Sequence, residues 1–177
     1  MPEYRRNRVA GGSYFFTVNL LDRRRGLLVE RIEVLRAAVR DVRRSAPFHV
    51  DAWVVLPEHM HCVWTLPEGD DDFSDRWRRI KGVFARGVGG GGAVSESRRR
   101  HGECGIWQRR FWEHTVRDER DYAAHVNYTH FNPVKHGLVA RAGDWPFSSF
   151  RRCVARGVYP ADWAGDGADL ADAGERR

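Results

Sequence analysis

Residues 53–67 read Trp53-Val54-Val55-Leu56-Pro57-Glu58-His59-Met60-His61-Cys62-Val63-Trp64-Thr65-Leu66-Pro67. The apolar runs on both sides of Pro57 are rich in β-branched and aromatic residues, which is typical of strands, and the short connection favours an antiparallel hairpin. Side chains alternate along a strand, so His59 and His61 point to one face. The alternate residues point to the other face, into a core: Met60, Cys62, Trp64 and Leu66.

Two histidines on the same face of one strand are a candidate metal site. Neutral imidazole is the commonest protein ligand for a divalent metal ion. The alternative is a pair of histidines on a half-exposed strand without any ligand. The spacing of His59 and His61 does not choose between these two interpretations, so the choice depends on the rest of the chain.

The composition indicates a globular protein of one domain. The chain has 177 residues, of which 42% are hydrophobic, and this length can bury a sizeable core. No segment approaches the ~20 apolar residues of a membrane span, and the N-terminus lacks the apolar core of a signal peptide. We therefore expect a cytoplasmic protein without a membrane partner. The three cysteines are odd in number and widely spaced, which argues against a disulfide framework.

The charge favours nucleic acid as the partner. The net charge is +6, and only Lys81 and Lys135 among the 30 basic residues are lysines. Arginine binds phosphate in a planar, two-pronged geometry and stacks on bases. A genome with a preference for arginine codons would explain the choice of arginine over lysine, but not the excess of positive charge.

The pattern of apolar residues predicts seven main elements. They are strand 13–20, helix 30–44, strands 48–56 and 59–66, helix 74–86 capped by Ser74, strand 106–116, and a helix from its cap Asp118 to Phe131, before Pro133. This order, β-α-β-β-α-β-α, predicts an α+β fold with a ferredoxin-like (RRM-like) four-stranded antiparallel sheet and helices on one face. His59 and His61 would then lie on the open face of the sheet.

The segments outside these elements set the predicted domain boundaries. Residues 87–105 are rich in glycine, serine and arginine and are typical of a flexible linker, not of a phosphate-binding loop. We expect residues 145–152 to fold back onto a domain of residues 1–152, followed by a C-terminal tail of residues 153–177. A zinc site formed by His101, Cys104 and His114 fits no standard spacing.

The last predicted helix carries a stripe of polar residues. Asp121, His125, Tyr128 and Asn132 follow one another at steps of four, three and four, so they share one face. A tyrosine hydroxyl would lie about one turn from an amide oxygen that can ligate a metal ion. The alternative is an amphipathic helix whose solvent-facing side happens to hold these residues.

Six segments occur in a fixed order along the chain: Tyr4-Arg5-Arg6, Tyr14–Thr17, Leu56–His61, Trp107-Gln108 with Phe111–His114, Tyr128–Gly137, and Asp144–Ser149. Together they resemble the IS200-like single-tyrosine transposases, and more closely the REP-associated branch, the RAYT proteins. The likeness covers residues 4–152. A His-hydrophobic-His motif alone is weak, whereas the ordered set of motifs is specific.

The resemblance implies an HUH nuclease with a ferredoxin-like sheet. His59 and His61 would be two ligands of Mg²⁺ or Mn²⁺, and Tyr128 would be the nucleophile that forms a covalent 5′-phosphotyrosine intermediate. Asn132 stands where related transposases place the glutamine that completes the metal site, and its side chain is shorter by one methylene. No second tyrosine lies one helical turn from Tyr128 on its face, which fits a single-tyrosine enzyme.

The implied substrate is single-stranded DNA with a hairpin (REP-like) structure, which the enzyme would cleave and transfer. For DNA contacts we expect the basic arm with Arg5, Arg6 and Arg8, and the loop with Trp145 and Arg151. The relatives imply either a homodimer that exchanges the tyrosine helix or a monomer.

Two other functions remain open at this point. One is a nucleic-acid-binding module that keeps the fold without catalysis, against which the intact His59, His61 and Tyr128 argue. The other is a basic RNA-binding domain, whose binding would be insensitive to chelators.

Overall fold

A computed structural model describes residues 6–24, 26–90 and 105–165 of the chain. The helices and strands are β1 (Ser13–Asn19), α1 (Leu27–Glu30), α2 (Ile32–Ser45), β2 (His49–Val55), β3 (His59–Thr65), α3 (Phe73–Gly87), β4 (Trp112–Thr115), α5 (Glu119–Lys135), the 3-10 helix η1 (Ala142–Asp144) and α6 (Phe150–Ala155). The strands form one antiparallel sheet in the order β2-β3-β1-β4. This confirms the predicted α+β class with its ferredoxin-like sheet. No helix within those ranges is long and apolar enough to cross a membrane.

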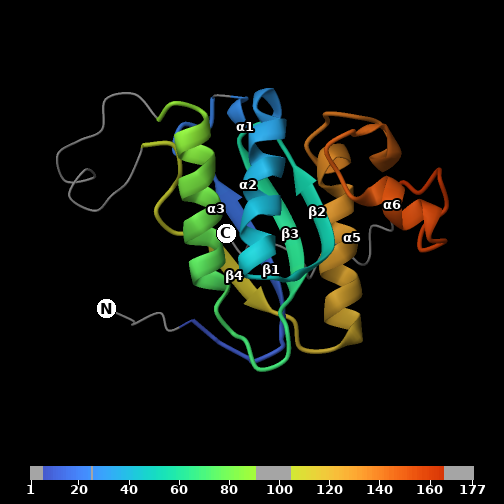
Figure 1. Ribbon diagram of the computed structural model, residues 1–177. Coiled ribbons are helices and arrows are strands. Elements are labelled where there is room, and N and C mark those ends of the chain that lie inside the picture. The colour runs from blue at the N-terminus through green and yellow to red at the C-terminus, as the bar shows by residue number, and fades with distance from the viewer. Residues whose placement is uncertain (1–5, 25, 91–104, 166–177) are drawn as a thin grey trace, which may run out of the picture.

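One face of the sheet packs against α2 and α3, which lie side by side across it (Figure 1). Met60, Cys62 and Trp64 of β3 are buried in this core, as their alternation predicted. The indole of Trp64 stacks on that of Trp77 in α3, with ring centroids 4.3 Å apart. Burial of each large apolar side chain contributes about 1.5–3 kcal/mol, so this face supplies most of the apolar stabilisation.

The opposite face is covered by α5, whereas the sequence pattern predicted that this face would be open. Phe15 and Val63 of the sheet pack there against Val126 and Tyr128 of α5. The predicted arrangement of helices on one face is therefore correct for α2 and α3 but not for α5. The polar stripe of α5 faces the sheet and not solvent, and this buries the two histidines of β3.

Aspartates begin the two long helices α3 and α5. The Asp118 carboxylate accepts the N–H of Asp121 at 2.8 Å, which confirms the predicted cap of α5. At α3 the cap is Asp72, which accepts the N–H of Asp75 at 3.0 Å. The predicted cap Ser74 is therefore wrong, and Ser74 lies in the first turn of α3.

The helix α5 continues past Pro133 to Lys135, whereas the predicted helix ended at Phe131. A proline removes only one helical hydrogen bond, and here it lies close to the end of the helix. The N–H of His136 still bonds to the carbonyl of Asn132 at 3.0 Å. Gly137, with φ at 68°, then ends the helix in a conformation that glycine adopts readily. The extra turn keeps Lys135 on α5.

The segment of residues 145–149 folds back onto the edge strand β2, as predicted. Ser148 pairs with Val54 in an isolated antiparallel bridge. The indole N–H of Trp145 donates to the carbonyl of Val55 at 2.9 Å. These contacts cover the polar backbone groups of a strand edge that would otherwise be open.

The structure describes all of the predicted fourth strand but only part of the predicted linker and C-terminal tail. β4 begins at Trp112, and Trp107 pairs with Leu20 only in an isolated bridge, so the strand predicted from residue 106 is shorter than expected. The predicted linker of residues 87–105 falls mostly outside the described ranges. The division into a domain of residues 1–152 and a tail stays a prediction, and Tyr159 of that tail is buried against Phe150.

Candidate active site

β3 presents His59 and His61 to α5. Only 4% of His59 and 3% of His61 is exposed. The two rings meet edge to face, with centroids 5.0 Å apart. The strand pairing places Thr17 of β1 directly beside His61. The predicted pair of histidines is thus buried on the face that also carries the polar stripe of α5.

Each of these imidazoles uses its Nδ1 atom within the protein. His59 Nδ1 donates to the Glu58 carboxylate at 2.9 Å, and His61 Nδ1 shares a hydrogen bond of 2.9 Å with the Thr17 hydroxyl. Partners of this kind fix the orientation of a metal-binding histidine and leave Nε2 for the ion. Both side chains are therefore oriented as metal ligands are.

Burial favours the neutral form of the two histidines. Burial lowers the pKa of His59, although the neighbouring Glu58 opposes the effect. Burial also lowers the pKa of His61 well below its ordinary value, and His59, His136 and Lys135 act in the same direction. A neutral imidazole has the lone pair that a metal ion needs.

Asn132 supplies the third predicted ligand atom. Its side chain is fully buried, and its Nδ2 donates to the backbone carbonyl of Tyr128 at 3.1 Å. Its Oδ1 is buried without a hydrogen-bond partner in the described part of the chain. The amide also interacts with the His61 imidazole and slightly opposes the lowering of its pKa. A buried carbonyl oxygen without a partner costs free energy, so Asn132 fits a site that an ion completes.

Tyr128 lies against this group. Its ring meets that of His61 edge to face, with centroids 5.3 Å apart. Phe15 contacts both rings, at 5.8 Å from Tyr128 and 5.5 Å from His61. The structure thus brings together His59, His61, Tyr128 and Asn132, the four residues predicted for catalysis and metal binding.

Lys135 is a further residue of this candidate site, and the sequence pattern did not predict it. Its Nζ donates to the Tyr128 hydroxyl at 3.1 Å and lies 4.5 Å from the centre of the Tyr128 ring. Seven residues span two helical turns, so the spacing of Tyr128 and Lys135 would have placed both on one face, had the helix been continued past Pro133. His136 is a second addition, with its ring 5.1 Å from that of His59.

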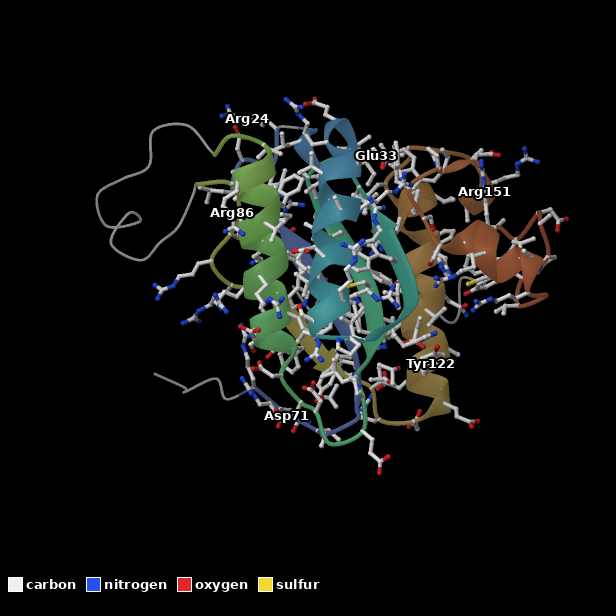
Figure 2. All side chains as sticks on the ribbon, in the orientation of Figure 1. Arg24, Glu33, Asp71, Arg86, Tyr122 and Arg151 are labelled. Atoms are coloured by element: carbon white, nitrogen blue, oxygen red, sulfur yellow. The ribbon has the colours of Figure 1, made fainter. Side chains whose placement is uncertain are left out.

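The predicted DNA contacts fall into two groups, and Arg5 lies outside the described residues. Arg6 lies over the ring of Phe111 at 4.0 Å and Arg8 pairs with Asp71 at 3.4 Å, both near the start of α3. Asp71 is labelled in Figure 2.

The second group lies beside β2. Trp145 bonds to that strand, and Arg151 on α6, labelled in Figure 2, donates to the carbonyl of Gly143 at 3.0 Å. The DNA-binding role of both groups stays a prediction.

A second group of potential metal ligands lies one turn before Tyr128. The group consists of His114 of β4 and of Asp121 and His125 of α5. Each offers one ligand atom, and these three atoms lie within 4.8 Å of one another. His114 Nε2 donates to Asp121 at 2.8 Å. Burial raises the pKa of Asp121, but hydrogen bonds from His114 and Arg117 outweigh it and lower that pKa to about 2. These three side chains could hold a metal ion, although the carboxylate already has partners.

Comparison with known proteins gives close relatives along the whole chain, although no protein-family model matches it. The REP-associated tyrosine transposase of Escherichia coli (strain K12) is 55% identical over 176 residues, 99% of this chain and 98% of that protein. A relative from Haemophilus influenzae is 42% identical over 167 residues, 94% of this chain and 95% of that protein. A solved structure of a REP-associated tyrosine transposase bound to a REP hairpin matches with a TM-score of 0.85 and 54% identity, and covers 100% of this chain and 99% of that one.

Proposed function

Because the chain belongs to the REP-associated tyrosine transposases, we propose that it cleaves single-stranded DNA beside a hairpin and rejoins it through a covalent bond to Tyr128. The observation that supports this most is the buried carbonyl oxygen of Asn132, which has no hydrogen-bond partner among the described residues and belongs to an amide that interacts with the His61 imidazole. An oxygen and two neutral imidazoles beside a tyrosine hydroxyl are the parts that metal-assisted phosphoryl transfer requires.

His59, His61 and Asn132 are the proposed ligands of Mg²⁺ or Mn²⁺. When bound, the ion would supply Lewis-acid polarisation of the scissile phosphate. The group of His114, Asp121 and His125 is the weaker candidate, because hydrogen bonds from His114 and Arg117 already satisfy the carboxylate. A ligand atom without a partner gains more from an ion than one that must first give up its hydrogen bonds.

Tyr128 is the proposed nucleophile. Its Oη attacks the phosphorus, the bond from phosphorus to the 3′-oxygen breaks, and the 3′-oxygen takes up a proton. The products are a 5′-phosphotyrosine and a free 3′-hydroxyl. Lys135 donates a hydrogen bond to Oη and stabilises the negative charge as the hydroxyl loses its proton. Attack by a 3′-hydroxyl on the phosphotyrosine reverses the step, restores Tyr128 and joins the DNA.

The proposed substrate is a REP-like hairpin with a single-stranded extension. A solved relative with 54% identity is described as bound to a REP hairpin, and the net charge of +6 favours a polyanionic partner. We expect an unpaired strand because the attacked phosphate must reach Tyr128, a residue that is only 7% exposed and packs between the sheet and α5.

The test is a denaturing gel of the protein with end-labelled hairpin DNA and Mn²⁺. We expect a covalent adduct with the wild type and none with Tyr128→Phe or in the presence of a chelator. Tyr122→Phe is the matched control, because Tyr122, labelled in Figure 2, lies on the same helix and instead donates to Asp51 at 2.9 Å. Tight binding without an adduct under any divalent metal would favour a nucleic-acid-binding module without catalysis.

A further inference from the structure

A pocket with a volume of about 270 Å³ lies along the edge strand β2, between α2 and residues 147–152. Its apolar lining side chains, among them Val39, Trp53 and Phe147, are buried or half-buried. Four exposed arginines complete the lining: Arg36, Arg40, Arg43 and Arg152. The apolar side chains thus form the inner wall and the arginines the mouth. We refer to these residues as the arginine pocket.

The arginine pocket is positively charged, because no aspartate or glutamate lines it. Arg43 donates to the carbonyl of Phe48 at 3.0 Å and Arg152 to that of Val50 at 2.8 Å. A backbone carbonyl orients a guanidinium without neutralising it. Arg40 has no hydrogen bond or ion pair with any residue that the structure describes, and among the four only Arg36 pairs with a carboxylate, that of Glu33. Oriented guanidinium groups of this kind suit phosphate.

The inner wall suits a nucleobase. Trp53 and Phe147 are half-buried, so part of each aromatic surface faces the pocket. Bases stack on such rings with little dependence on sequence. The volume lies just below the roughly 300–1,000 Å³ of small-molecule sites, which fits one base better than a larger ligand.

The pocket lies on the other face of the sheet from the candidate active site. Trp53 packs against the core of α2 and α3, whereas Tyr128 packs in the core beside α5. A nucleotide in the pocket is therefore not the one that Tyr128 attacks. Since β2 is the last strand on its side of the sheet and residues 145–149 cover its edge, a DNA strand that reaches both sites must pass around this covered edge.

We infer that the arginine pocket binds one unpaired nucleotide of the substrate DNA, with its base against Trp53 and Phe147 and its phosphate on the arginines. The inference rests on the proposed function, because that function makes single-stranded DNA the partner. The pocket then holds the strand at a second point, away from the scissile phosphate.

The test measures the affinity of Tyr128→Phe for labelled hairpin DNA with a single-stranded extension, by fluorescence polarisation in the presence of a chelator. Adding Arg40→Ala should weaken binding about tenfold. It should also reduce the slope of log affinity against log salt concentration by the amount expected for about one lost phosphate contact. Arg44→Ala is the matched control, because Arg44 is exposed on the same helix and does not line the pocket. It should change the affinity less than about twofold. Equal losses from both variants would overturn the inference.

An abasic scan of the extension tests the base contact. Removal of the base at one position should lower the affinity of the protein for the DNA about tenfold. Arg40→Ala should reduce that loss, since Arg40 and the aromatic rings bind the same nucleotide. A uniform loss along the extension, or none, would contradict the inference. No strand is cut in chelator, so these results do not depend on the adduct. If the adduct assay fails while the contrast between Arg40 and Arg44 holds, only the proposed catalysis is lost.

Discussion

Lys135 is the charged residue that acts directly on the tyrosine hydroxyl. Its ammonium donates to Oη, and in the proposed mechanism it would stabilise the charge that develops on that oxygen during attack. We expect Lys135→Met to lower the single-turnover rate of adduct formation by about tenfold to a hundredfold. Lys135 is exposed, so the variant should fold as the wild type does. Arg120→Met, an exposed cation at the other end of α5, should leave the rate unchanged, and equal losses would exclude a specific role for Lys135.

Asn132 and His125 distinguish the two groups that could hold a metal ion. If the ion binds His59, His61 and Asn132, Asn132→Ala should abolish the rise in melting temperature that Mn²⁺ produces, because the site loses its only oxygen ligand. His125→Ala should keep that rise. Asn132→Asp should strengthen Mn²⁺ binding, since a carboxylate is the harder, charged ligand. The reverse pattern would place the ion between His114, Asp121 and His125.

At the scale of the element, Asp121 ties the start of α5 to β4. Its pKa lies at about 2, below the ordinary 3.8, because hydrogen bonds from His114 and Arg117 outweigh the effect of burial. The folded state therefore favours the ionised carboxylate. Its contribution of about 2 kcal/mol is complete above about pH 4 and is lost as the pH falls through about 2.

We expect Asp121→Asn to lower the free energy of unfolding at neutral pH by about 2 kcal/mol. In the variant, the free energy of unfolding should no longer show the decrease that Asp121 causes between about pH 4 and 2. Urea unfolding across this range measures both effects. Asp41→Asn, at an exposed position of α2, serves as the control and should leave the free energy of unfolding at neutral pH unchanged. An unchanged acid profile in Asp121→Asn would show that Asp121 is not held in its ionised form.

The strands could be predicted from sequence because their alternation is strong, and that of β3 already placed His59 and His61 on one face. The position of α5 could not be predicted in the same way. Its buried side carries Asp121 and His125, so it lacks the apolar stripe that normally marks a face turned to the core. Lys135 was missed because its contact depends on the helix continuing past Pro133. The arginine pocket was missed because distant segments line it.

At the scale of the whole molecule, buried histidines couple folding to pH. His59, His61, His125 and His130 are each at most 4% exposed, and burial lowers the pKa of each, for His130 to about 3. The hydrogen bonds of His130 fit the neutral ring, since Nε2 accepts from the Ser149 hydroxyl at 2.8 Å. His130 thereby joins α5 to the segment that covers β2.

In the unfolded chain these histidines bind protons near their ordinary pKa of 6.5, whereas burial in the folded protein lowers the pKa of each. The unfolded state therefore binds more protons, and the free energy of unfolding falls as the pH drops below about 6.5, by up to about 1.4 kcal/mol per pH unit for each group. Urea unfolding in chelator between about pH 7.5 and 5.5 should show this slope. His130→Gln should reduce this slope by about the binding of one proton. A flat profile would mean that the histidines are protonated in the folded state, which would leave His59 and His61 without the lone pairs that a metal ion needs.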